Sequence, residues 1–181
     1  MRCSWANNEL AIKYHDNEWC KISKDDSYIF EMLVLESFQA GLSWNTILKK
    51  RENFREAFDN FDYKKISNYK ENKIEELLQN EGIIRHKLKI NTTINNAKKF
   101  IEIQKEFGTF ENYIWDFVEG KQIINNWKEM KEVPVKTELS DKISKDLKKR
   151  GFKFVGSTII YSFLQAIGII DDHIEGCFCK K

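Results

Sequence analysis

The chain has 181 residues, with 30 basic and 28 acidic side chains and a formal net charge of +2. That length fits a single domain over 1–181 with a sizeable core, and the balance of charge excludes binding to nucleic acid through overall charge alone. Eight Gly and one Pro are too few for a turn-rich β-sandwich and favour helices.

Apolar residues at helical spacing occur along most of the sequence. The first expected helix covers 23–41, where Asp25 and Asp26 supply caps and Gly41 ends it. The other expected helices cover 43–58, 62–69, 71–80, 87–107, 109–119, 140–150 and 156–168. A tight turn is expected at 81–86, and a loop at 120–138 around Pro134. Alternation typical of a strand never lasts more than a few residues, so the sequence predicts an all-α fold.

No run approaches the roughly 18–20 apolar residues of a membrane span. The first five residues, Met1 to Trp5, lack the apolar stretch of a signal peptide. We therefore expect a cytoplasmic protein without a membrane partner. In that compartment four Cys are expected to be free thiols or metal ligands rather than disulfides.

Cysteine and histidine gather at the two ends of the sequence. Cys3 and His15 lie near the start, and His173 and Cys177 near the end. Such a set suits a tetrahedral Zn²⁺ ion, and four protein ligands would make the ion structural, which excludes a zinc hydrolase. Spacing alone leaves the alternative open that Cys3 and His15 are a buried thiol and a surface imidazole far from the other pair. Cys20 and Cys179 remain unassigned.

Glu36 lies on a largely apolar face of the first expected helix, whereas Glu31 points elsewhere and is expected to be solvated. A carboxylate on such a face needs a partner or has a raised pKa. One interpretation is that backbone amides or a core Tyr or Trp satisfy it. The other is a pocket carboxylate near Trp44 and the segment 14–19, where aromatic rings suit a flat cationic ligand such as an alkylated purine.

A series of short motifs runs in order through nearly the whole chain, from Cys3 to Cys177. They are Cys3-x-Trp5, Tyr14-His15-Asp16-Asn17-Glu18-Trp19, Phe30-Glu31-Met32 with Leu35-Glu36, Gln39-Ala40-Gly41-Leu42-Ser43-Trp44, Leu48-Lys49-Lys50-Arg51, Gly82-Ile83-Ile84-Arg85-His86, Lys148 to Gly156, Tyr161-Ser162-Phe163-x-Gln165-Ala166 and Asp172-His173-x3-Cys177. Together they resemble the DNA-3-methyladenine glycosylase I family of bacterial base-excision enzymes. Two positions depart from the family pattern: Ala11 stands where an aromatic is usual, and Cys20 where Gly is common. The first departure predicts that one pocket wall is open or rebuilt.

The resemblance implies a fold and a metal site. The fold is that of the helix-hairpin-helix glycosylases, in one domain. A structural zinc ion, held by Cys3, His15, His173 and Cys177, is expected to join the N- and C-termini.

The resemblance also implies a reaction and a pocket. The expected substrate is double-stranded DNA containing an alkylated purine, and hydrolysis of the N-glycosidic bond releases free 3-methyladenine and leaves an abasic site. Glu36 is expected to hydrogen-bond the flipped base, with recognition rather than general base catalysis as its role. Tyr14 and Trp44 are expected to form aromatic walls, with Trp5 and Trp19 as pocket neighbours. We expect the enzyme to act as a monomer.

Residues expected to contact DNA lie in turns and basic runs. They are Gly82, Ile84 and Arg85 in the tight turn, Lys87 and Lys89 just after it, Leu42, and Lys153 with the runs 49–51 and 148–150. Backbone amides at the start of a helix can bind a phosphate, and the basic side chains add charge. Any one such run is usually a solvated helix face, whereas several on one face would make a DNA footprint. Leu42 is either a wedge in the space left by the base or a core residue.

Two other interpretations remain. A non-catalytic, zinc-clipped helical module that binds DNA or protein would need neither Glu36 nor the Tyr14 and Trp44 pair, so the presence of all three favours the enzyme. Asp16 and Glu18 as an acid–base pair is the weaker alternative, because on an extended or capping segment they are expected to pair with Lys13 or Lys21.

Overall fold

The computed structural model describes residues 1–180, most of which are helical. The elements are α1 (Glu9–Asn17), α2 (Asp26–Gln39), α3 (Trp44–Ala57), η1 (Asp59–Phe61), α4 (Tyr63–Ile66), α5 (Glu71–Gln79), α6 (Lys87–Phe107), α7 (Phe110–Asp116), β1 (Ile123–Ile124), η2 (Met130–Glu132), α8 (Glu138–Lys149), α9 (Ser157–Ala166) and β2 (Ile170–Asp171). Within this part of the chain no helix is both long and apolar enough to cross a membrane.

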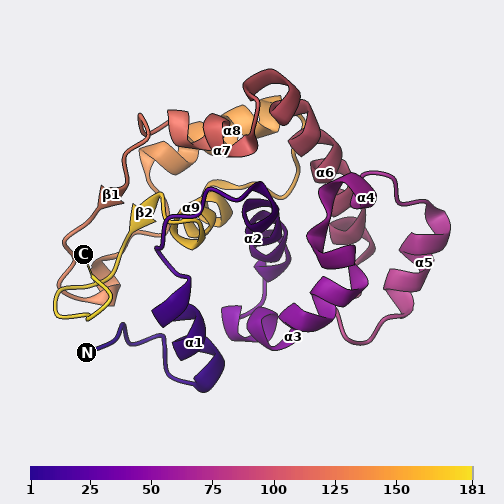
Figure 1. Ribbon diagram of the computed structural model, residues 1–181. Coiled ribbons are helices and arrows are strands. Elements are labelled where there is room, and N and C mark those ends of the chain that lie inside the picture. The colour runs from indigo at the N-terminus through magenta and orange to yellow at the C-terminus, as the bar shows by residue number, and fades with distance from the viewer. Residues whose placement is uncertain (181) are drawn as a thin grey trace.

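Helix α2 lies at the centre of the molecule (Figure 1). Every residue from 29 to 38 is buried, and α2 packs against α3, α6, α7 and α9. A helix that is apolar nearly all round is stable only when other elements cover it. The core around α2 therefore encloses the carboxylate of Glu36.

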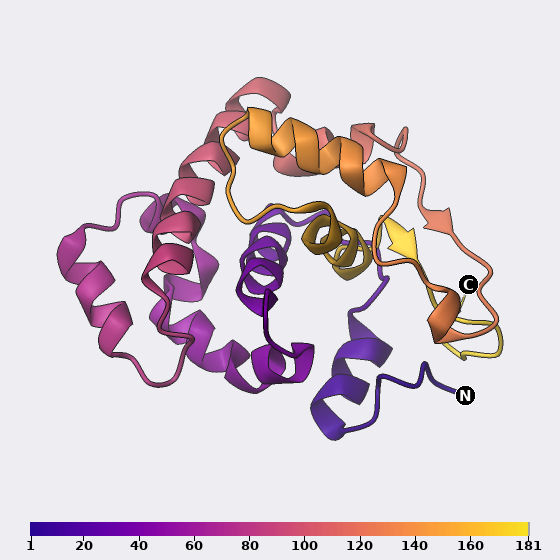
Figure 2. The same ribbon diagram turned by 180° about the vertical axis from the view of Figure 1, so that it is seen from behind.

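The chain ends meet on one side of the molecule. Strand β1 pairs in parallel with β2, with Ile123 opposite Ile170. The backbone amide of Phe178 donates to the carbonyl of Met1 at 3.0 Å. Both views place the N- and C-termini on the side of the molecule that carries this small sheet (Figures 1 and 2).

The prediction of a mostly helical fold is confirmed, and the expected helix over 87–107 coincides with α6. Of the expected extended or capping segment at Asp16 and Glu18, Asp16 lies in helix α1, which the Asn8 side chain caps, and Glu18 is the C-cap residue of that helix. One local expectation is wrong, because the expected loop at 120–138 contains β1 and η2. Elements of two or three residues are too short to give a periodic signal.

A buried ion network joins α2 and α3 to the segment after α1, and it corrects two expectations. Glu31 is buried rather than solvated, and Arg51 is buried rather than part of a basic surface. Arg51 donates from Nε to Glu31 at 2.6 Å and from Nη1 to Glu18 at 2.9 Å. Arg55 also donates to Glu31, at 3.0 Å. Glu18 therefore pairs with Arg51 and not with a nearby Lys.

Replacing Arg51 with Met is expected to lower the free energy of unfolding by roughly 3 kcal/mol. The change removes the guanidinium that pairs with Glu18 and Glu31, so much of their negative charge is no longer compensated in a buried site. Urea denaturation followed by circular dichroism would measure it. Lys49→Met, an exposed neighbour on the same helix, is the control and should stay within about 0.5 kcal/mol of wild type. Equal stabilities of the two variants would contradict the importance of the network.

Candidate functional site

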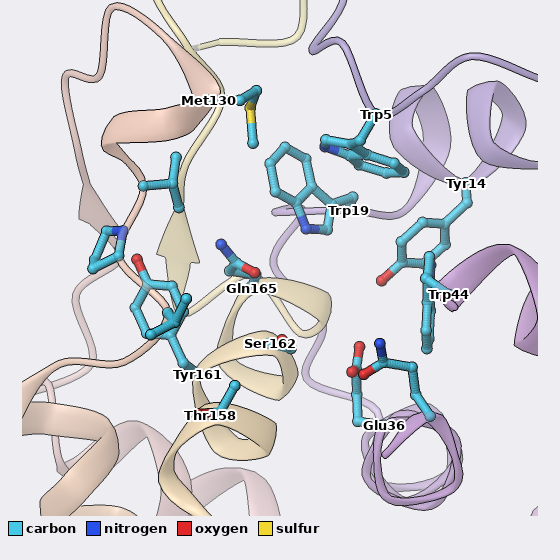
Figure 3. A pocket seen from close by; sticks show the side chains of 14 residues that line it. Trp5, Tyr14, Trp19, Glu36, Trp44, Met130, Thr158, Tyr161, Ser162 and Gln165 are labelled. Atoms are coloured by element: carbon cyan, nitrogen blue, oxygen red, sulfur yellow. The ribbon is translucent and has the colours of Figure 1, made fainter. Parts of the chain in front are cut away.

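A cavity of about 380 Å³ opens between the N-terminal segment, α2, α3, α9 and the loop after β1. Figure 3 shows its lining side chains arranged around one open space. The lining residues are Trp5, Tyr14, Trp19, Glu36, Gln39, Trp44, Met130, Val133, Pro134, Val135, Thr158, Tyr161, Ser162 and Gln165. The structure therefore brings together all five residues that the sequence predicted for the pocket, and adds a second wall.

Glu36 is the only carboxylate among the cavity's lining residues. It is 4% exposed, and desolvation by burial raises its pKa from 4.5 to about 8. The alternative that a backbone amide or a core Tyr or Trp satisfies it finds no support in the hydrogen bonds of residues 1–180. A buried acid in this state gains most from a ligand that brings hydrogen-bond donors or positive charge.

Aromatic rings cover the N-terminal side of the cavity. Tyr14 and Trp44 lie with ring centroids 5.3 Å apart, and Trp5 and Trp19 form an edge contact at 5.0 Å. The Tyr14 hydroxyl and the Trp44 indole N–H are buried, and each lacks a hydrogen-bond partner within residues 1–180. Buried donors without partners are uncommon in folded proteins. These rings therefore offer both stacking surfaces and free hydrogen-bonding groups to a ligand.

The opposite wall comes from α9 and from the loop around η2, and sequence reasoning assigned it no role. Tyr161 and Gln165 lie four positions apart on α9 and both reach the cavity. Thr158 and Ser162 share this helix face and also line the cavity, so polar residues at helical spacing were the available signal. The loop residues Met130, Val133 and Pro134 gave none, because a loop's position depends on packing and not on periodicity.

The two departures from the family pattern have different structural outcomes. Ala11 is buried in α1, one turn before Tyr14, and is not among the residues that line the cavity. Cys20 has a φ of 62°, in the left-handed region where Gly is most common. Its thiol accepts from the backbone amide of Asp172 at 3.4 Å. A buried Cys therefore adopts the left-handed backbone conformation here, which Gly would adopt more easily.

A cluster of thiols and imidazoles lies where the chain ends meet. The side chains of His15, His173, Cys177 and Cys179 offer ligand atoms within 4.8 Å of one another. His15 Nε2 lies 3.6 Å from Cys177 Sγ, and the two imidazole rings are 5.0 Å apart. The alternative that His15 is a surface imidazole far from the C-terminal pair is therefore wrong: it is fully buried beside them.

Each histidine in this cluster has one nitrogen held by a carboxylate. His15 Nδ1 lies 2.8 Å from Asp16, and His173 Nδ1 lies 2.8 Å from Asp171. His173 Nε2 is buried without a partner in the described residues. A carboxylate on Nδ1 orients the ring and raises the basicity of the other nitrogen, as at many metal sites. The Asp16 carboxylate also forms an ion pair with Arg2. This ion pair takes the place of the expected pairing with the Lys13 or Lys21 ammonium group.

Two cysteines compete for the fourth position in the cluster. Cys3 is buried, which raises the pKa of its thiol to about 12, and it contacts Cys177. Cys179 lies 4.0 Å from His15, but from Nδ1, the nitrogen that Asp16 already holds. Cys177 lies on the Nε2 side instead. The four residues whose ligand atoms lie within 4.8 Å of one another include Cys179 and not Cys3. The structure therefore leaves both Cys3, which contacts Cys177, and Cys179 as candidates for the fourth ligand.

The helical hairpin formed by α5, the turn at 80–86 and the start of α6 carries exposed basic side chains. Arg85 and Lys87 are exposed there, and Lys153 is exposed on the loop before α9. The Gly82 amide donates to Asn80 Oδ1 at 2.8 Å, so it is not available to a phosphate, contrary to expectation. The first backbone amides of a helix have no intrahelical partner. At the start of α6, the amides of Lys87 and the residue after it are therefore the ones available to a phosphate. Ile84 is partly buried and packs against the core.

Lys89 has a different role from the one predicted. It is buried, and its ammonium group donates to the carbonyls of Phe38 and Ala40 at 2.8 and 2.7 Å. It therefore fixes the end of α2 instead of adding charge to the surface. That end leads through Gly41, which has a φ of 82°, to Leu42 and Trp44, and Leu42 is 36% exposed. This exposure disfavours the alternative that Leu42 is a core residue.

Proteins that act on one base of a nucleic acid must move it out of the stack and into a pocket that fits a single ring system. The cavity has the size, the aromatic walls and the hydrogen-bonding groups for one flat heterocycle. Fold and site together define a helical protein that binds a flipped nucleobase.

Comparison with known proteins identifies the family. A family model described as methyladenine glycosylase matches residues 5–180. The chain is 46% identical over 180 residues to DNA-3-methyladenine glycosylase of Haemophilus influenzae, covering 99% of this chain and 97% of that one. It is also 46% identical to DNA-3-methyladenine glycosylase 1 of Escherichia coli K12, covering 98% and 96%. The chain belongs to the methyladenine glycosylase family.

Solved structures agree with this assignment. A crystal structure of 3-methyladenine DNA glycosylase I superposes with a TM-score of 0.96 at 48% identity, over 100% of both chains. The Staphylococcus aureus enzyme, solved to explain 3-methyladenine recognition, has a TM-score of 0.96 at 33% identity, covering 99% of this chain and 96% of that one. The predicted resemblance to this family is confirmed.

Proposed function

We propose that this protein removes 3-methyladenine from DNA by hydrolysing its N-glycosidic bond, leaving an abasic site. The observation that carries the proposal is Glu36, a buried carboxylate without a partner in residues 1–180, in a cavity walled by aromatic rings. Family membership supports the same reaction. Free 3-methyladenine is the product.

The chemistry follows from the charge on the damaged base. Methylation at ring position 3 makes the adenine of the nucleotide cationic, so it is already a good leaving group. The rings of Tyr14 and Trp44 attract a cation through their π faces. Glu36 accepts hydrogen bonds from the base, and its negative charge is stabilised by the cation opposite. Water then attacks the anomeric carbon of the sugar as the bond to the base breaks. The bonding electrons leave with the base, which becomes neutral, and the attacking water loses a proton to solvent.

A Zn²⁺ ion held by Cys3, His15, His173 and Cys177 is part of the proposal. The donor set fits, because His173 Nε2 is buried without a partner in the described residues and carboxylates orient both imidazole rings. Four protein ligands leave no open position, so the ion holds the chain ends together and takes no part in hydrolysis. The cluster lies next to the pocket, since Trp19 contacts both imidazole rings.

The DNA substrate is expected to be a duplex, bound by a monomer along the exposed hairpin. Leu42 stands on the turn next to the pocket and is the candidate to fill the space that the flipped base leaves. Arg85, Lys87 and Lys153 are the candidate phosphate contacts. A non-catalytic DNA-binding module would share this surface, but it would have no need for the buried acid.

Replacing Lys87 with Ala is expected to weaken binding to undamaged and damaged duplex alike. One lost phosphate contact reduces the slope of log K against log salt by about 1. Fluorescence anisotropy over a salt series would measure this slope. Lys105→Ala, an exposed residue at the far end of the same helix, is the matched control and should leave the slope unchanged. Salt-insensitive binding by the wild type would contradict the phosphate model.

The decisive experiment is base release from alkylated duplex DNA by the purified protein, with the freed bases separated and identified. Release of 3-methyladenine with an abasic site in the DNA is the expected result. Binding to the duplex without any release would overturn the enzyme and favour the binding module.

A further inference from the structure

Asp172 is a fully buried carboxylate immediately after β2, and it is not among the residues that line the cavity. Its Oδ2 accepts from the Tyr161 hydroxyl at 2.5 Å and from Gln165 Nε2 at 2.7 Å. Its Oδ1 accepts from Asn125 Nδ2 and from the Trp127 indole, both at 2.7 Å. An ionised carboxylate offers about four acceptor sites. Asp172 therefore has a donor for each of them.

These four donors connect two walls of the pocket. Tyr161 and Gln165 line the cavity from α9. Asn125 and Trp127 belong to the segment that leads from β1 to η2, whose residues Met130 and Val133 line the cavity from another side. One buried carboxylate thus holds both the α9 wall and the loop wall in place.

Asp172 also determines which end of the Gln165 amide faces the cavity. A carboxylate only accepts hydrogen bonds, so the amide must turn its NH₂ group towards Asp172. Its carbonyl oxygen then points the other way. In Figure 3 the nitrogen of Gln165 lies on the Tyr161 side, and the oxygen lies towards the open space shared with Glu36 and Tyr14. The pocket therefore presents a second acceptor, opposite the aromatic wall.

We propose that Asp172 is a positioning residue for base recognition, which holds Gln165 so that its carbonyl oxygen accepts a hydrogen bond from the bound base. This inference rests on the proposed function and extends it from Glu36 to the opposite wall. An adenine derivative carries N–H donors on its exocyclic amino group, and an acceptor in the wall selects for them. A base that presents a carbonyl oxygen at that position would meet the Gln165 oxygen and be rejected.

Asp172→Asn tests this directly, because it preserves size while making one arm of the side chain a donor. The new NH₂ group opposite Gln165 makes the Gln165 amide turn over, and its NH₂ group then faces the base. The affinity for free 3-methyladenine is expected to fall about tenfold. Titration of the intrinsic fluorescence of the pocket tryptophans would measure the dissociation constant. Bound zinc and helix content are measured alongside, since Asp172 adjoins His173.

A second substitution separates orientation from general damage. Adding Gln165→Glu to Asp172→Asn restores an acceptor on both sides of residue 165, so it is expected to recover most of the lost affinity. A merely structural role for Asp172 would give no recovery. Asp26→Asn is the matched control: that carboxylate accepts from Gln104 and from two backbone amides away from the pocket. Its loss is expected to lower thermal stability but not affinity.

The outcomes are distinct. If the wild type releases 3-methyladenine and Asp172→Asn binds it as tightly as wild type, the inference is overturned while the proposed function stands. If the wild type releases no base, the proposed function itself fails. Should Asp172→Asn not fold, Gln165→Met removes the acceptor at nearly constant length, and unchanged affinity in that variant would overturn the inference instead.

Discussion

Glu36→Gln is expected to lower the rate of base release about 10- to 100-fold and, at the same time, to make the protein more stable above pH 8. The amide keeps the shape of the side chain but cannot carry the negative charge that a cationic base requires. Hydrogen bonds to a charged group contribute about 1.5–3 kcal/mol, which corresponds to this range of rates. Single-turnover release of 3-methyladenine would measure the first effect.

The stability effect has a definite dependence on pH. The folded-state pKa of Glu36, about 8, is above its ordinary value of 4.5. The folded state therefore holds a proton that the unfolded state loses, and the stability linked to this group is fully present below pH 4.5 and is lost as pH rises through 8. The loss amounts to roughly 3–5 kcal/mol in all. Urea denaturation from pH 5 to 9 should show this decline in wild type.

The control for both effects is Glu75→Gln, which changes an exposed carboxylate on α5. It should retain wild-type activity and a wild-type pH profile. Two results would count against the assigned role of Glu36. One is that Glu36→Gln releases the base as fast as wild type. The other is that the stability of Glu36→Gln falls with rising pH as steeply as the stability of wild type.

Removal of zinc is expected to produce the second large effect. A ligand that binds only the folded state stabilises that state by about 4 kcal/mol when the free ligand concentration is about 1,000 times the dissociation constant. His173→Ala should lose the ion and a comparable amount of stability. Limited proteolysis should then cut near the chain ends first, because the core around α2 lies away from the cluster. Metal analysis of the purified protein would give the zinc content.

The cysteine variants provide the sharper comparison. Cys3→Ala is expected to lose zinc, whereas Cys179→Ala should retain one ion per chain, because Cys179 lies beside the His15 nitrogen that Asp16 holds. The reverse pattern would move the fourth ligand to Cys179. Full zinc content in every one of these variants would refute the site.

The sequence predicted the helices and the N-terminal half of the pocket because both depend on local patterns. Glu36 lies on a face that its own helix defines, and Tyr14 and Trp44 lie within recognisable motifs. Gln165 and Met130 were not assigned to the pocket, because their positions depend on hydrogen bonds and packing between segments far apart in the chain. Arg51 and Lys89 were misplaced for a related reason: a basic side chain gives the same signal on a surface as in a buried ion pair.

The pocket is built from both ends of the chain, with Tyr14 on one wall and Tyr161 and Gln165 on the other. The backbone amide of Cys20 donates to the carbonyl of Gln165, and the Phe178 amide donates to the carbonyl of Met1. Synthesis proceeds from the N-terminus, so α2 and its neighbours can pack before α9 exists. The pocket is therefore completed only after α9 has left the ribosome. A nascent chain that still lacks α9 holds the acid and the aromatic rings but has no α9 wall opposite them, and so cannot enclose a base.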